Sequence, residues 1–207
     1  MKQFSLKLIL FITFLILSLT SIQNASSEQV NELKNDDRFL GNIDAPITVI
    51  EYASLSCPHC AAFHLEILPI IKKEYIDNDK VRLIFRDFPL NLPAFEASMI
   101  LRCVDKELYF KYLDALFKLQ KKWALPKGSR ESLFNILQNS GMTQNEFDNC
   151  LDDNELKDKI YNNQLKAHKE FNMQTTPSFI INGKLLQGSK SIDTFRKIFD
   201  DILSNKT

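Results

Sequence analysis

The sequence of 207 residues predicts an α/β fold in which two blocks of strand and helix are separated by a long all-helical block. Three observations support this. A strand–helix–strand pattern spans residues 47–85, residues 93–172 are helical almost throughout, and a hairpin pattern returns at residues 177–188. Hydrophobic residues make up 44% and charged residues 25%, which is typical of a globular protein.

Residues 1–27 have the layout of a secretory signal peptide. Two lysines precede an apolar run over Leu8–Leu19, and small polar residues follow it. A helix of this length spans about 18 Å, too short for a hydrocarbon core of about 30 Å. We therefore expect cleavage after Ser27, leaving residues 28–40 as an N-terminal extension; the alternative is an uncleaved anchor.

The first α/β block covers residues 41–91. Ile47–Ala53 is short, β-branched and almost continuously apolar, as expected of a strand covered on both faces. It leads into Ser56–Cys60 and then into a helical pattern, in which Pro69 should cause a kink. Val81–Phe85 predicts a second strand, parallel to the first.

The helical block covers residues 92–170. Apolar residues recur at steps of three and four positions in each of its expected helices, and Ser129 and Thr143 are candidate N-caps. Thr143 with Glu146 predicts a capping box. The expected helices are Ala94–Val104, Leu108–Leu119, Ser129–Leu137, Thr143–Leu151 and about 154–171.

The last block covers residues 171–207. Asn182-Gly183 between two apolar runs predicts a hairpin with a type I′ turn. Ser191 should cap a final amphipathic helix that runs to Ile202. The first and last blocks together predict a thioredoxin-like fold with an inserted all-helical domain.

The motif Cys57-Pro58-His59-Cys60 lies where the first strand passes into a helix. Cys57 is placed at the N-cap and Pro58 at the first helical position, where a missing N–H costs nothing. Free N–H groups, the positive end of the helix dipole and His59 favour a thiolate at Cys57, so its pKa should be strongly depressed. Cys60, deeper in the first turn, should act as the resolving thiol.

A low pKa at Cys57 stabilises the reduced form and makes the Cys57–Cys60 disulfide an oxidant. The alternatives are an inert disulfide and half of a zinc site. Zinc would need two further ligands, and Cys103 and Cys150 are single cysteines without a neighbouring histidine. We therefore predict no metal, and no cofactor other than the redox-active disulfide.

Two further residues are candidates for the site. Pro177 opens a strand after a helix ends, where a cis peptide would expose the neighbouring backbone; a trans proline that ends the helix is the alternative. Glu51 lies in the middle of the first strand, six residues before Cys57. Buried there, its carboxylate could carry protons to Cys60; the alternative is an exposed edge position.

The segment from Ala45 to Cys60 resembles the active-site strand and helix of DsbA-type thiol-disulfide oxidoreductases, and the resemblance covers nearly the whole mature chain. It implies that Glu51 is the buried glutamate of this family and Pro177 its cis-proline. Thr176 departs from the valine of the best-known enterobacterial members. Since this position touches the active-site sulfurs in the family, the Thr176 hydroxyl is expected to moderate the oxidising power.

Some alpha-proteobacterial members of this family look similar in the helical block and bridge a second cysteine pair. The resemblance thus implies a structural disulfide between Cys103 and Cys150, with two buried free thiols as the alternative. Closing this loop would restrict the unfolded chain by about 4 kcal/mol in the entropy model.

The resulting expectation is a periplasmic dithiol oxidase that acts on reduced or unfolded exported proteins. The resemblance implies reoxidation by a quinone-linked membrane partner of the DsbB type. We expect a monomer, and no nucleic-acid partner because no basic stripe is present. The alternatives are a disulfide isomerase or reductase using the same cysteines and a non-enzymatic holdase. His64 is expected on the helix surface, and neither it nor His168 is assigned a role.

Overall fold

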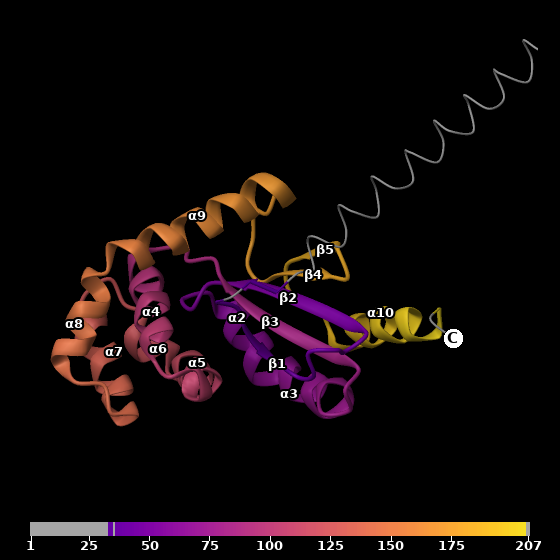
Figure 1. Cartoon of the computed structure of the whole chain (residues 1–207), viewed down its shortest axis with the longest axis horizontal. Coiled ribbons are helices and arrows are strands. Elements are labelled where there is room, and N and C mark those ends of the chain that lie inside the picture. The colour runs from indigo at the N-terminus through magenta and orange to yellow at the C-terminus, as the bar shows by residue number, and fades with distance from the viewer. Residues whose placement is uncertain (1–32, 35, 206–207) are drawn as a thin grey trace, which may run out of the picture.

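The computed structural model describes residues 33–34 and 36–205. The predicted signal peptide, residues 1–27, lies outside them. A mixed sheet of five strands forms one end of the molecule, and most helices of the insertion form the other (Figure 1). The predicted thioredoxin-like fold with an inserted helical domain is confirmed.

The sheet is built around β2 (Ile47–Ala53), which pairs in parallel with β3 (Val81–Asp87). On the other side β2 pairs antiparallel with β4 (Ser178–Ile181), which continues into β5 (Lys184–Gln187). The order is β1-β3-β2-β4-β5. The edge strand β1 (Arg38–Leu40), which the sequence pattern did not predict, pairs antiparallel with β3.

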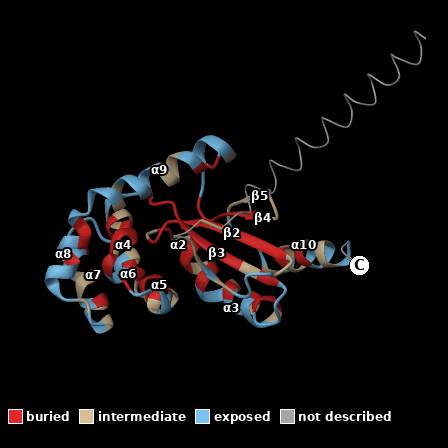
Figure 2. Cartoon of the chain, in the orientation of Figure 1, coloured by how far each residue is buried: buried red, intermediate tan, exposed pale blue. Residues whose placement is uncertain are grey.

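Every residue of β2 is buried because helices cover both of its faces (Figure 2). Ile50 and Tyr52 face the cluster that includes Ala167 of the long helix α9 (Asn154–Phe171). Side chains alternate along a strand, so Val49, Glu51 and Ala53 share the opposite face, toward the helix that carries the cysteines. The strand thus places Glu51 beneath the active-site helix.

The helical segment after the cysteines is continuous but not uniform. It consists of α2 (Pro58–Ala62), the π-turn η1 (Phe63–Ile67), α3 (Leu68–Ile71) and the π-turn η2 (Lys72–Ile76). Pro69 lies between the two π-turns. Because proline lacks an N–H and clashes with the preceding turn, widened turns next to it are the expected local response.

The insertion runs from the end of β3 to α9. The capping box of Thr143 and Glu146 is present as predicted. Ser129, however, is the first helical residue rather than the N-cap, because Gly128 in the left-handed conformation (φ 75°) takes the cap position. The elements are α4 (Leu92–Cys103), η3 (Lys106–Leu108), α5 (Tyr109–Lys118), α6 (Gln120–Trp123), α7 (Ser129–Leu137), η4 (Gln138–Ser140) and α8 (Gln144–Asp152).

The C-terminal part follows the predicted pattern. Asn182 (φ 44°) and Gly183 (φ 85°) are both left-handed, as a type I′ hairpin turn requires. Ser191 accepts a hydrogen bond from the backbone of Thr194 and caps α10 (Ile192–Ser204). None of the helices in the described part of the chain is both long and apolar enough to cross a bilayer.

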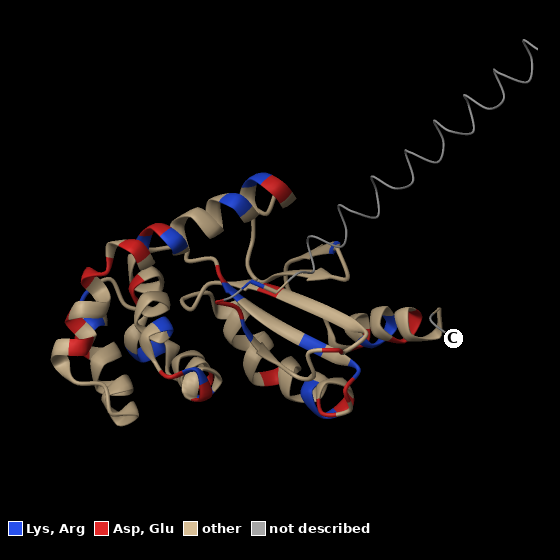
Figure 3. Cartoon of the chain, viewed as in Figure 1, with Lys and Arg blue, Asp and Glu red and all other residues tan. Residues whose placement is uncertain are grey.

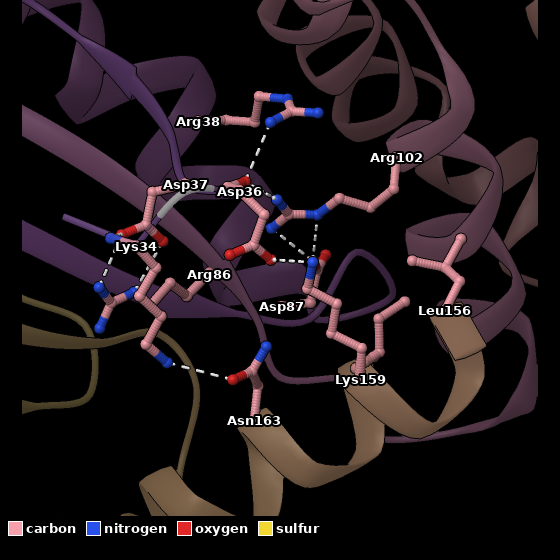
Figure 4. Close-up of a pocket in the computed structure, with 11 residues that line it drawn as sticks. Lys34, Asp36, Asp37, Arg38, Arg86, Asp87, Arg102, Leu156, Lys159 and Asn163 are labelled. Carbon is pink, nitrogen blue, oxygen red and sulfur yellow. Dashed lines mark hydrogen bonds and ion pairs between the residues drawn. The ribbon is translucent and has the colours of Figure 1, made fainter.

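A network of charged residues holds the segment before β1 against the rest of the domain (Figure 4). Asp37 accepts two hydrogen bonds from Arg86 on β3. Arg102 on α4 donates to Asp87 at the end of β3 and to the carbonyl of Asp36. Elsewhere both charge signs occur along α9 and α10, without a stripe of one sign in this view (Figure 3).

The insertion contains a disulfide between Cys103, at the end of α4, and Cys150 in α8, with a sequence separation of 47. This is the pairing that the resemblance implied.

Replacing both Cys103 and Cys150 with alanine should lower the free energy of unfolding by about 4 kcal/mol, because the unfolded chain regains the freedom of that loop. Denaturant unfolding of the variant and of the parent chain, with Cys57 and Cys60 reduced in both, measures the difference. Thiol-disulfide exchange should be unchanged. A variant of parental stability would show that the bridge contributes nothing to folding.

Candidate active site

Cys57 lies at the start of the helical segment, as predicted. Its backbone is extended (φ −80°, ψ 120°), it is the N-cap of α2, and Pro58 follows at the first helical position. The Cys57 carbonyl accepts backbone hydrogen bonds from Cys60 and Ala61, both at 3.1 Å. Pro58 and His59 are exposed on this first turn.

The two thiols are free in this structure and differ in access. Cys57 keeps 7% of its surface exposed, whereas Cys60 is fully buried. An incoming sulfur can therefore reach only Cys57 of the pair. This asymmetry leaves Cys57 as the accessible sulfur of the pair and Cys60 as its buried partner.

The surroundings separate the two thiols in acidity as well. Hydrogen bonding from Cys60, from Thr176 and from the backbone of Cys60 and His59 lowers the pKa of Cys57 to about 5, against the opposing effect of burial. Burial, the hydrogen bond to Cys57 and the charge of Glu51 raise the pKa of Cys60 far above its ordinary value. At pH 7 Cys57 is thus a thiolate and Cys60 a thiol.

The loop before β4 closes the site. The peptide bond between Thr176 and Pro177 is cis, and the carbonyl of Thr176 lies 3.4 Å from the Cys57 sulfur. The side chain of Thr176 is buried, and its hydrogen bonding to Cys57 contributes to the low pKa of that thiol. Its expected influence on oxidising power stays a prediction.

A shallow pocket lies beside the cysteines on the side of Pro177. It is partly open to solvent, and apolar side chains line it together with His59 and Lys190. Its lining residues are His59, Ala62, Phe63, Glu66, Ile67, Pro177, Phe179, Ser189 and Lys190. A polypeptide that reaches Cys57 would lie along this surface.

Gln120 is a residue of the site that sequence reasoning missed. From α6 its side-chain amide donates to the carbonyls of Leu55 (2.8 Å) and Cys57 (3.0 Å). It is buried, and it ties the insertion to the loop that carries the cysteines. In the sequence, the signal for Gln120 is a single amide side chain in the helical block, between the apolar residues Leu116 and Trp123.

The expected surface position of His64 is wrong. His64 is buried, and its Nε2 lies 2.8 Å from Oε2 of Glu51, which is itself fully buried on β2. His64 follows Cys60 by four positions, so both lie on one face of the helix, and this spacing was the overlooked signal. Burial alone would lower the pKa of His64, but Glu51 and Asp114 raise it to about 9.

His168 hydrogen-bonds through Nδ1 to the carbonyl of Met173 (2.7 Å), just beyond the end of α9. In the described part of the chain, no three His, Cys, Asp or Glu side chains gather in a group that could hold a metal ion.

Comparison with known proteins agrees with this geometry. The family model described as "Thioredoxin" matches residues 33–201. The crystal structure of Wolbachia pipientis alpha-DsbA1 superposes with a TM-score of 0.79 at 33% identity, covering 87% of this chain and 96% of that one. "Probable disulfide bond formation protein D" of Bacillus anthracis is 30% identical over 87% of this chain and 85% of its own length.

A "Putative protein-disulfide oxidoreductase" of Rickettsia bellii is 35% identical over 73% of this chain. This chain spans 59% of the length of that protein and 65% of its relative in Rickettsia typhi.

Proposed function

Because the chain belongs to the thioredoxin family and, within it, to the DsbA-type protein-disulfide oxidoreductases, we propose that it is a dithiol oxidase that introduces disulfide bonds into exported proteins. The observation that carries the proposal is the contrast between the two thiols. An accessible sulfur with a pKa of about 5 sits next to a buried one whose pKa is raised. This contrast favours the reduced protein, so the disulfide form readily takes up electrons.

The reaction consists of two exchanges. A substrate thiolate attacks Sγ of Cys57, the bond between Cys57 and Cys60 breaks, and Cys60 leaves with the electron pair and takes up a proton. A second substrate thiolate then attacks the substrate sulfur of the mixed disulfide, and Cys57 leaves as a stable thiolate. The substrate loses two electrons to form its disulfide, and the enzyme gains two as a dithiol.

The residues around Cys57 take supporting roles in this proposal. Pro58 and His59 start the helix, and the backbone N–H of His59 helps to hold the thiolate. Pro177 and Thr176 place a backbone edge beside the sulfur, where the substrate chain of the mixed disulfide can lie. Glu51 exchanges protons with Cys60, whose pKa its charge helps to raise.

The cycle needs an electron acceptor, and we propose a quinone-linked membrane partner of the DsbB type that reoxidises the Cys57–Cys60 pair. Export by way of the leader predicted at residues 1–27 supports a periplasmic location. There the reduced or unfolded exported proteins would be its substrates, and we propose that the chain acts on them as a monomer.

Two other functions predict different behaviour. A disulfide isomerase or reductase would use the same cysteines in the reduced form, and Thr176, which disulfide isomerases also carry before the proline, favours it. A holdase would bind unfolded chains without needing either sulfur.

The test is oxidative folding of a reduced protein of known disulfide pattern. Stoichiometric oxidised enzyme should form substrate disulfides at least about 100-fold faster than a peptide disulfide whose thiols have an ordinary pKa near 9, because Cys57 leaves the mixed disulfide as a stable thiolate. Reactivation of the same substrate with scrambled disulfides by the reduced enzyme is the comparison. Fast reactivation with slow oxidation would identify an isomerase instead.

A further inference from the structure

The buried Cys60 has no direct access to water, yet the proposed reaction requires it to gain and lose a proton in every cycle. Its surface is fully buried, and so is that of Glu51. Oε2 of Glu51 contacts Nε2 of His64, while Oε1 has no hydrogen-bond partner among the described residues. A proton on Glu51 therefore needs a further group to reach solvent.

His64 is placed to be that group. One ring nitrogen contacts Glu51, and the other, Nδ1, is buried without a hydrogen-bond partner in the described structure. Nδ1 lies 3.9 Å from Oδ1 of Asp114 on α5, whose side chain is 64% exposed. The imidazole thus lies between a fully buried carboxylate and one that meets water.

The remaining neighbours of His64 cannot carry a proton. Phe117 of α5 stacks on the imidazole at 4.3 Å, and Phe85 of β3 and Phe63 meet it edge-on at 5.8 and 5.5 Å between ring centroids. The charged groups with the largest influence on His64 are Glu51 and Asp114. The aromatic rings also keep water from the pair.

We propose that His64 and Asp114 form a proton path between solvent and Glu51, and that His64 is thereby a positioning and proton-carrying residue of the active site. The proposal rests on the proposed thiol-disulfide chemistry. It assigns the helical insertion a part in the reaction, because Asp114 comes from α5 of the insertion.

Each half of the cycle moves one proton. When the disulfide opens, the Cys60 thiolate takes a proton from the Glu51 carboxyl group, and His64, which keeps its Nε2 proton toward the new carboxylate, takes up a proton from water at Nδ1 through Asp114. When the disulfide forms again, Cys60 returns its proton to Glu51, and His64 releases its Nδ1 proton to water through Asp114. His64 is thus an imidazolium in the reduced protein and a neutral imidazole in the oxidised protein, and its ring need not turn.

The test separates the two chemical steps in the reduced protein. Oxidised glutathione reacts first with the Cys57 thiolate, and Cys60 then closes the disulfide and must lose its proton. Asp114→Asn should leave the first step unchanged and slow closure about threefold in dilute buffer, while His64→Gln should slow closure at least about tenfold. Glu107→Gln, which removes an exposed carboxylate with no hydrogen bond or ion pair in the described part of the chain, is the matched control and should change neither step.

Adding an external base gives a second measurement. The closure rate of Asp114→Asn should respond to the base if Asp114 carries protons, and should not respond if its role is purely structural. Added imidazole should accelerate closure in Asp114→Asn, because it can accept the proton at Nδ1 in place of the carboxylate, and should have little effect on the parent chain. Closure in Asp114→Asn at the parental rate, or insensitive to imidazole, would overturn the path. Because Asp114 is a surface residue, its variant keeps the test decisive if His64→Gln fails to fold. Failure of the parent chain to react with glutathione would instead overturn the proposed function.

Discussion

Replacing Cys57 with alanine is expected to reduce disulfide formation in substrates to below about 1% of the parental rate. Cys60 cannot substitute for it, since Cys60 is fully buried and its pKa is raised. At pH 7 a thiol with a pKa of about 5 is almost wholly ionised, whereas one near 9 is about 1% thiolate. Oxidative folding of a reduced substrate, followed by mass spectrometry after alkylation, measures the loss.

Cys60→Ala provides the complementary result. Its Cys57 thiolate can attack an oxidised substrate, but no second sulfur can release the product, so a mixed disulfide should accumulate. The double alanine variant of Cys103 and Cys150 is the matched control and should keep parental exchange. Undiminished rescue of exported substrates by Cys57→Ala would contradict redox chemistry and support a holdase.

The second large effect is a pH-dependent difference in stability between the reduced and oxidised forms. The pKa of Cys57 falls from 9.0 to about 5 on folding. A lowered folded-state pKa stabilises the protein above that pKa, and the contribution is lost as the pH falls through it. Relative to the oxidised form, the reduced form should therefore gain about 3 kcal/mol between pH 4 and pH 7, and about 4 kcal/mol by pH 8.

Denaturant unfolding of both forms at several pH values measures this difference. The oxidised form is the internal control, because it carries the same ionisable groups except the two thiols. Cys57→Ser, reduced, should lose the dependence, since a hydroxyl does not ionise in this range. A stability difference that does not change between pH 4 and pH 8 would show that Cys57 is not held as a thiolate, and the basis for calling the protein an oxidant would be lost.

The active-site strand, the cysteine helix and the hairpin were predictable because their signals are local. Ile47–Ala53 is uniformly apolar apart from Thr48 and Glu51, and the structure has this strand over the same residues. The Asn182-Gly183 turn and the capping box at Thr143 likewise depend on a few consecutive residues. The edge strand β1 escaped prediction because its three residues are stabilised by pairing with β3 and not by a pattern of their own.

The residues of the site also fall into those that the sequence could predict and those that it could not. Cys57 at a helix start and a cis bond before Pro177 could be expected from motif and resemblance. The contacts of Gln120 with the Cys57 carbonyl and of Arg102 with Asp87 could not, because each joins segments whose approach depends on how the insertion docks on the sheet.

By itself, the sequence determined the fold class, the order of the elements and the identity of the redox pair, since these follow from apolar periodicity and from residues adjacent in the chain. Only the tertiary structure decided what surrounds that pair. His64 looks like a surface residue when its helix is considered alone. It becomes the buried partner of Glu51 because the strand lies beneath the helix and α5 of the insertion covers it, and burial in the folded molecule, rather than residue type, governs how such groups hold their protons.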